Sequence, residues 1–175
     1  MDTFDCIASK LDVREYTSEK KVPKEIKLKT LEAARLTGSG NNTQHWRFLL
    51  IQDRVDLKKL ADDSTTGKFV ESADYAVIVL TNPALGYHMI DAGRAVQDMQ
   101  LAAWNYGVAS RLFTGMNKEA LKKDFRIPEN MDPTITVAFG YPKKKITGKR
   151  KKRNPLSEVA YIDTFGNKFD HGGLT

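Results

Sequence analysis

The stretch GYHMIDAGRAVQDMQLAAWNY, residues 86–106, decides the architecture that we expect for this chain of 175 residues. Apolar side chains recur along it at alternating spacings of three and four, which is the period of an α-helix. One stripe consists of Met89, Ala92, Val96, Met99, Ala103 and Tyr106, and it is widened by Ile90, Leu101 and Trp104. A helix that is apolar around so much of its circumference has to be buried on most sides, either at the centre of the fold or against a second chain.

Shorter helices and strands flank this long helix in the sequence. We expect strands at residues 45–52, 75–80, 109–116 and 134–140, and helices at residues 3–11, 22–36, 55–63, 67–73 and 117–125. The run YAVIVL, residues 75–80, is apolar without alternation, which is typical of a strand covered on both faces. Because helices and strands do not alternate strictly, the sequence favours an α+β fold with a central sheet over a doubly wound parallel sheet.

The chain shows neither an internal repeat nor a domain boundary, so we expect residues 1–175 to form a single domain. The tail after residue 153 has little periodicity, and we interpret it as an extension that wraps around a neighbour such as a second subunit. Charges at Asp2, Asp5 and Lys10 argue against a signal peptide, and no window approaches the roughly 18 apolar residues of a membrane span. A cytoplasmic protein is therefore expected.

Several common kinds of catalytic site find no support in the residues available. Cys6 is the only cysteine, so neither an intrachain disulfide nor a CxxC metal motif is possible. His45, His88 and His171 follow no metal-binding spacing, and we expect no metal site. GxSxG nucleophile motifs and glycine-rich phosphate loops are also missing from the sequence. An enzyme built on this chain would take its reactivity from a bound cofactor.

Positive charge is concentrated near the C-terminus. The formal net charge is +6, and the run KKKITGKRKKR, residues 143–153, holds eight basic residues and no acidic one. Such a run is often a solvated loop, but it would also suit a phosphorylated small molecule or a nucleic acid. Single-stranded nucleic acids stack on aromatic side chains interleaved with the cations, and residues 143–153 contain none, which disfavours that partner.

Three separated features together suit a single ligand. They comprise Lys10, Asp12 and Arg14, the loop Ser39–Gln44, and the pair Lys151 and Arg153. The first three residues alternate, so an extended backbone would point their side chains in one direction. FMN needs cations for its phosphate, and amide donors and acceptors for the pyrimidine edge of its ring. Asn41 and Asn42 also have a simpler interpretation as ordinary turn residues.

The order of these features resembles the FMN-dependent nitroreductase family. Residues 13–23 and 31–52 are similar to the opening of the family's sequences. In the family, this opening begins with a basic-x-Ser-x-basic element. One helix later it continues with a loop of small residues that ends in Asn-x-Gln-Pro-Trp. Residues 91–116 look like the family's long central helix and the glycine-bearing strand that follows it. The runs VAFGYP, residues 137–142, and KKRNPL, residues 151–156, look like its closing strand and its phosphate-binding pair. The resemblance implies a homodimer with a mainly antiparallel central sheet flanked by helices, a long buried central helix, and a C-terminal extension that packs on the partner subunit.

The resemblance also implies roles for individual residues. The FMN phosphate would be held by cations from both ends of the chain, namely Lys10, Arg14, Lys151 and Arg153. Lys68 would lie near the ribityl and pyrimidine oxygens, and the backbone N–H groups of Thr114 and Gly115 beside flavin N5. The ring and ribityl chain would be contacted from the partner subunit by Ser39, Asn42 and Gln44.

Four residues depart from the family's pattern. Asp12 replaces the usual serine and would place a carboxylate close to a dianionic phosphate, where Lys10 or Arg14 would pair with it. Leu11 occupies a position that is commonly basic. Gly38 and His45 stand where the family often has prolines, and we interpret His45 as a partly exposed structural histidine rather than a flavin neighbour.

The activity implied is that of an FMN-dependent oxidoreductase that uses NADH or NADPH. Hydride would pass through flavin N5 in a ping-pong cycle to a nitroaromatic, a quinone or a similar conjugated acceptor, and no side chain would have to act as acid or base. The alternatives left open are a specialised enzyme of the same fold for dehalogenation, azoline oxidation or flavin breakdown, and a non-enzymatic module that binds flavin or nucleic acid.

Overall fold

The computed structural model describes residues 1–144, 146, 151–170 and 172, and its centre is one four-stranded sheet. The strands are β1 (Arg47–Ile51), β2 (Tyr75–Thr81), β3 (Ala109–Phe113) and β4 (Asp132–Gly140). They lie in the order β1-β2-β4-β3, and every neighbouring pair is antiparallel. The expected α+β fold with an antiparallel central sheet is confirmed.

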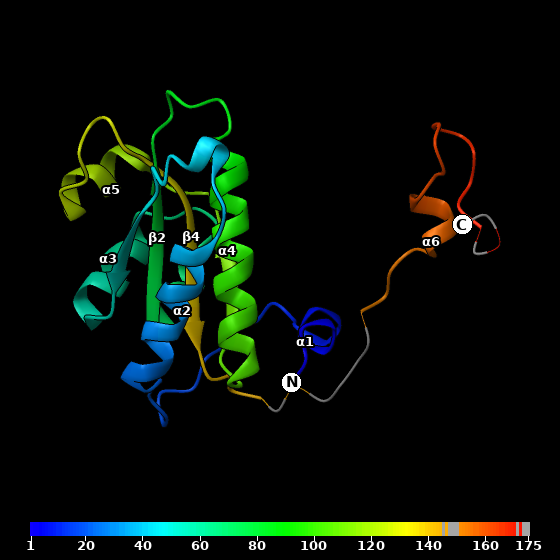
Figure 1. Cartoon of the computed structure of the whole chain (residues 1–175). Coiled ribbons are helices and arrows are strands. Elements are labelled where there is room, and N and C mark those ends of the chain that lie inside the picture. The colour runs from blue at the N-terminus through cyan, green and yellow to red at the C-terminus, as the bar shows by residue number, and fades with distance from the viewer. Residues whose placement is uncertain (145, 147–150, 171, 173–175) are drawn as a thin grey trace.

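Helices cover both faces of this sheet (Figure 1). The helices in the described residues are α1 (Thr3–Ser9), α2 (Lys24–Leu36), α3 (Arg54–Asp62), α4 (His88–Asn105), α5 (Lys118–Phe125) and α6 (Leu156–Val159), with short 3₁₀ turns η1 (Gly40–Asn42) and η2 (Lys68–Ser72), and of these α6 lies apart from the sheet. Residues of α2 and α4 share one apolar core with the sheet, whereas α3, η2 and α5 share the other. Asp53 starts α3 by accepting hydrogen bonds from the N–H groups of Val55 and Asp56, and Asn117 caps α5 in the same way.

Strand β2 is buried on both faces, as its unbroken apolar sequence predicts. Its odd-numbered residues, such as Val77 and Val79, pack in the core with α4, while Ala76 and Ile78 pack with α3. This division follows from the alternation of side chains along a strand. Near the end of the strand its register with β4 shifts, beside Pro133, which has no N–H group to give to the ladder.

The long helix α4 is buried along its middle and exposed at its ends. Ala92 and Met99 are fully buried, in agreement with the predicted stripe. At the ends of the helix, Met89 is 58% exposed, Ile90 66% and Tyr106 39% within this single chain, and the sequence prediction leaves burial against a second chain as the alternative there. The helix therefore presents exposed apolar side chains in its first turn, while the Tyr106 ring just beyond its other end contacts Lys29.

The C-terminal tail stands apart from the body of the molecule (Figure 1). It contains the four-residue helix α6, which the sequence analysis did not predict because so short a segment has no recognisable period. Three of its apolar side chains are exposed, with Leu156 at 53%, Val159 at 60% and Phe165 at 90%. None of the helices in the described ranges is both long and apolar enough to span a bilayer.

Candidate cofactor-binding site

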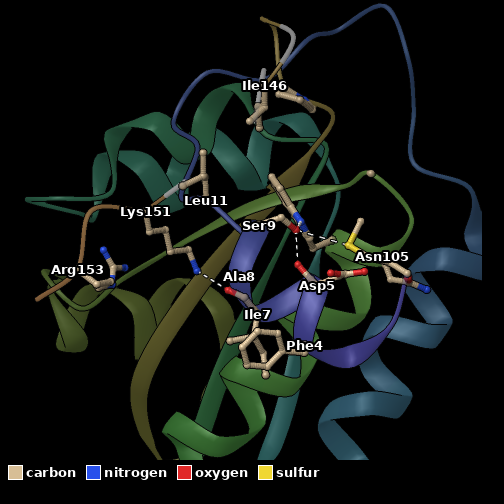
Figure 2. A pocket seen from close by; sticks show the side chains of 14 residues that line it. Phe4, Asp5, Ile7, Ala8, Ser9, Leu11, Asn105, Ile146, Lys151 and Arg153 are labelled. Atoms are coloured by element: carbon tan, nitrogen blue, oxygen red, sulfur yellow. Dashed lines mark hydrogen bonds between the residues drawn. The ribbon is translucent and has the colours of Figure 1, made fainter. Parts of the chain in front are cut away.

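Residues of α1 and of the segment at Lys151 and Arg153 line one cavity of about 1160 Å³. Figure 2 shows Lys151 reaching from the C-terminal segment to α1, where its Nζ donates a hydrogen bond of 2.7 Å to the carbonyl oxygen of Ile7. Arg153 lines the same cavity, and apolar side chains such as Leu11 and Trp104 form other parts of its wall. Cations near the C-terminus and the first helix are thus brought together, as the sequence predicts.

Four charged side chains form what we call the cation cluster: Lys10, Arg111, Lys151 and Arg153. Asp12 lies among them, since its carboxylate is paired with the Lys10 ammonium and has Arg111 Nη1 3.7 Å from its Oδ2 atom. Burial lowers the pKa of Lys151, the neighbouring charges of Arg153 and Lys10 lower it further, and Asp12 opposes this. An added dianion would relieve this repulsion between like charges.

The segment that carries Asp12 is fixed on the edge of the sheet. Asp12 forms a parallel bridge with Ser110 of β3, and the N–H of Val13 donates to the Ser110 carbonyl at 3.2 Å. The buried hydroxyl of Tyr16 lies 3.2 Å from the Ala138 carbonyl of β4, and burial, followed by the charge of Asp12, raises the pKa of this phenol. The position of the Asp12 backbone therefore depends on the sheet rather than on a flexible terminus.

Arg14 and Arg111 are two further basic side chains at this end of the molecule. Arg14 is exposed, and no hydrogen bond or ion pair joins it to any residue that the structure describes. Arg111, which the sequence analysis missed, takes part in the cluster. The only signal for it would have been the register of residues 12–13 on β3, which a single sequence does not reveal. Of the remaining basic run, Lys144 is exposed, whereas residues 145 and 147–150 lie outside the described residues.

Thr114, Gly115 and Lys68 lie around the other end of β3. A side chain at Gly115 would place its Cβ 2.4 Å from Thr66 Oγ1, so the close approach of these two segments requires glycine. The N–H of Gly115 donates to the same oxygen at 3.2 Å, while Lys68 Nζ donates to the Asp62 carbonyl at 3.1 Å. Four residues of strand separate Ser110 from Thr114, about 13 Å, so the cluster and the predicted N5 contacts lie along one edge strand.

The loop Ser39–Gln44 has an unusual backbone. Asn41, Asn42 and Gln44 have φ angles of 51°, 54° and 47°, in the left-handed region that asparagine enters more readily than other non-glycine residues and that is unusual for glutamine. The loop is closed by internal hydrogen bonds, including one of 3.0 Å from the Gln44 N–H to Ser39 Oγ. The side-chain amides of all three left-handed residues are exposed and have no hydrogen-bond partner within the described chain. A strained, closed loop with unpartnered amides suits a ligand contact better than a plain connection.

Buried polar contacts fasten this loop to the first turn of α4. The Oδ2 atom of Asp91 accepts from the N–H of Gly40 at 2.9 Å and lies 3.1 Å from His45 Nε2. Because the N–H of Asn82 donates to His45 Nδ1 at 3.3 Å, the ring proton must be on Nε2 and faces Asp91. His45 has contacts of a structural kind and is partly exposed as a residue, as predicted, although its side chain is only 5% exposed.

The loop and the cation cluster lie at opposite ends of α4. The loop is attached at Asp91, whereas Asn105, at the other end, lines the cavity of the cluster. Fourteen residues of α-helix separate these positions, which is about 21 Å. One chain therefore holds two separate parts of the predicted site.

The residues present fit a flavin monophosphate. The cluster supplies several cations against one carboxylate, Gly115 permits close backbone packing at the far end of β3, and the loop presents unpartnered amides. Among the described residues, no group of three or more His, Cys, Asp or Glu side chains is placed to hold a metal ion. The chemistry of the donors is that of phosphate and amide recognition.

Comparison with known proteins shows the family to which this chain belongs. The model of the nitroreductase family matches residues 7–88 and 77–141, which together span most of the chain. The chain belongs to the nitroreductase family. A nitroreductase-family relative from Archaeoglobus fulgidus, named "Putative NADH dehydrogenase/NAD(P)H nitroreductase", is 31% identical over 147 residues, which are 78% of this chain and 83% of the relative. An iodotyrosine deiodinase from Thermotoga neapolitana is 25% identical over 181 residues, covering 89% and 94% of the two chains.

Solved structures of the nitroreductase family share the fold. A protein from Bacteroides thetaiotaomicron VPI-5482, with the same name as the Archaeoglobus relative, superposes with a TM-score of 0.84 at 28% identity, covering 91% of this chain and 96% of that one. An FMN-dependent nitroreductase from Clostridium difficile R20291 gives a TM-score of 0.79 at 21% identity, covering 95% and 99%. At that identity the second likeness concerns the fold alone.

Proposed function

We propose that this nitroreductase-family chain is an FMN-dependent oxidoreductase that uses NADH or NADPH, and that it forms a homodimer of single-domain subunits with one flavin per chain. The observation that carries the proposal is that Lys10, which follows α1, lies close to Lys151 and Arg153, two cations that line one cavity. The name of the Archaeoglobus fulgidus relative, which contains NAD(P)H nitroreductase, supports it.

The cation cluster would bind the phosphate. Charge-assisted hydrogen bonds are worth about 1.5–3 kcal/mol each, so Lys151 and Arg153 together would dominate retention of the ligand. Arg14 is exposed and would need only a side-chain rotation to approach, because its backbone lies in the same fixed segment as Asp12. The ligand would then extend along β3 toward Thr114 and Gly115, with Lys68 on the same side.

The loop Ser39–Gln44, which we call the amide loop, would contact the flavin bound by the other subunit. Its separation of about 21 Å from the cluster along α4 makes a contact to the same ligand within one chain difficult, whereas a second copy could bring Ser39, Asn42 and Gln44 to the ring. The exposed apolar residues Ile90, Leu156 and Phe165 support a partner surface, and the tail would pack there.

When bound, FMN supplies two-electron transfer at N5, by which NADH or NADPH reduces a nitroaromatic, a quinone or another conjugated acceptor in a ping-pong cycle. The residues of this chain would bind and orient. Positive charge from Lys68 would favour the anionic reduced form of the ring, and the amides of Asn42 and Gln44 would fix the plane of the ring.

Reductive dehalogenation is the second candidate, and the likeness to an iodotyrosine deiodinase favours it specifically. The two activities differ in acceptor and not in the predicted flavin contacts. Assaying the purified protein with a nitroaromatic and with a halogenated phenol under identical conditions would separate the two activities. Nitroreductase activity would reduce the nitro group of the first compound, and dehalogenase activity would release halide from the second.

An absorbance spectrum followed by addition of NADH or NADPH tests the proposal. We expect a yellow protein, or one that becomes yellow when reconstituted with FMN, whose visible bands bleach anaerobically with either nucleotide. A colourless protein that does not bind added FMN would contradict the proposed function. A yellow protein that neither nucleotide bleaches would instead indicate flavin storage or sensing.

A further inference from the structure

We propose that Asp91 is a positioning residue that holds the amide loop Ser39–Gln44 in its binding conformation. The inference rests on the proposed FMN site and adds a residue that belongs to neither of its two parts. Asp91 lies in the first turn of α4 and has a side chain only 2% exposed. It acts on the flavin contacts only through the loop.

The contacts of Asp91 reach the loop at both of its ends. Its Oδ2 atom accepts from the Gly40 N–H at 2.9 Å, at the start of the left-handed segment, and faces His45 Nε2 at 3.1 Å, one residue after the segment ends. Arg94 Nη1 lies 3.9 Å from the other oxygen, which places a compensating charge nearby. A single carboxylate thus contacts the backbone near the start of the loop and the histidine that directly follows it.

His45 transmits this restraint to the sheet. Its Nδ1 accepts from the N–H of Asn82, the residue after β2, and its ring meets the ring of Tyr87 edge to face at 6.0 Å. The Tyr87 ring also covers Gly40, where an added Cβ would lie 2.5 Å from a ring carbon. The loop is therefore held against both the end of β2 and the start of α4.

This arrangement explains how the loop keeps three left-handed residues in one conformation. Three left-handed residues that are not glycine would relax in a free loop, and their amides would then lose the orientation that binding requires. A restraint already present in the free protein reduces the ordering that binding has to impose. Removing it should weaken FMN binding while leaving the phosphate contacts intact.

The test compares Asp91→Ala, Asp91→Asn and Asp98→Ala by FMN titration and by hydrogen exchange of the free protein. Asp98 is an exposed carboxylate on the same helix without a partner in the described residues, and it serves as the control. Asparagine can still accept from Gly40 and His45 through one oxygen. We expect Asp91→Ala to bind FMN at least tenfold more weakly and to exchange the Gly40 amide hydrogen faster. The FMN affinity of Asp91→Asn should stay within about threefold of that of the unsubstituted protein, and Asp98→Ala should change neither quantity.

Unaltered FMN affinity in Asp91→Ala, or weaker affinity without faster exchange in the loop, would overturn the inference. If that variant does not fold, Gly40→Ala decides, because its methyl group collides with Tyr87 and displaces the loop while Asp91 is retained. Unchanged affinity in Gly40→Ala would then overturn it. Failure of the unsubstituted protein to bind FMN would instead contradict the proposed function, so the two failures are distinguishable.

Discussion

The two ends of α4 carry parts of the predicted site that differ in kind. At the His88 end, the amide loop is closed by its own hydrogen bonds and fastened by the buried Asp91. At the Asn105 end, Lys151 and Arg153 of the cation cluster line an open cavity with apolar walls, and their charges repel each other. The first part is held by hydrogen bonds within the chain, whereas the second gathers like charges around one carboxylate. In the proposed function, recognition of the ring would depend on geometry and recognition of the phosphate would depend on charge.

The largest expected effect concerns the cation end. Lys151→Ala combined with Arg153→Ala should weaken FMN binding at least a hundredfold, because each charge-assisted contact is worth about 1.5–3 kcal/mol. Fluorescence titration of the apoprotein with FMN would measure it. Lys152→Ala is the matched control, since an extended backbone points that side chain the other way. Unchanged flavin occupancy in the double variant would refute the phosphate role of this segment.

A smaller effect is expected at the loop end. Asn42→Gly removes the amide without forcing alanine into a left-handed conformation, and should weaken FMN binding about three- to tenfold, the value of one neutral hydrogen bond. The loss should be insensitive to salt, unlike that of the double lysine and arginine variant. Thr43→Ala, which changes the neighbouring exposed residue at an ordinary φ of −69°, is the control. Equal affinities for Asn42→Gly and Thr43→Ala would remove Asn42 from the site.

The smallest effect should have the opposite sign. Asp12 lies within the cation cluster and repels a phosphate dianion, but its side chain is 42% exposed, so solvent screens it. Asp12→Asn should therefore tighten FMN binding by about two- to fivefold at low salt, with the gain disappearing at high salt. Titrations at two ionic strengths would measure this. Weaker binding in the variant would mean that Asp12 orients Lys10 and Arg111 more than it repels the ligand.

The sequence predicted the fold better than the contacts of the site. The apolar run of β2 and the stripe of α4 follow directly from side-chain period, and both were confirmed along their buried lengths. Met89 and Tyr106 are exposed within the single chain, and periodicity identifies an apolar face without showing whether the same chain or a second one covers it.

Residues that depend on long-range register were missed. Arg111 joins the cluster only because residues 12–13 pair with β3 at Ser110. Asp91 could have been noticed, since a carboxylate beside the apolar position Ala92 has to find partners if it is buried. The identity of those partners, Gly40 and His45, depends on where the loop returns to the helix.

The most direct measurement uses a mixed dimer. One subunit would carry Lys151→Ala with Arg153→Ala, and the other Asn42→Gly with Gln44→Gly, each with a different affinity tag so that only the heterodimer is purified. If the loop serves the neighbouring flavin, one site keeps intact cations and an intact loop, and we predict one FMN per dimer bound with the original affinity. A heterodimer in which no site retains that affinity would contradict the central claim that a site is assembled from two chains.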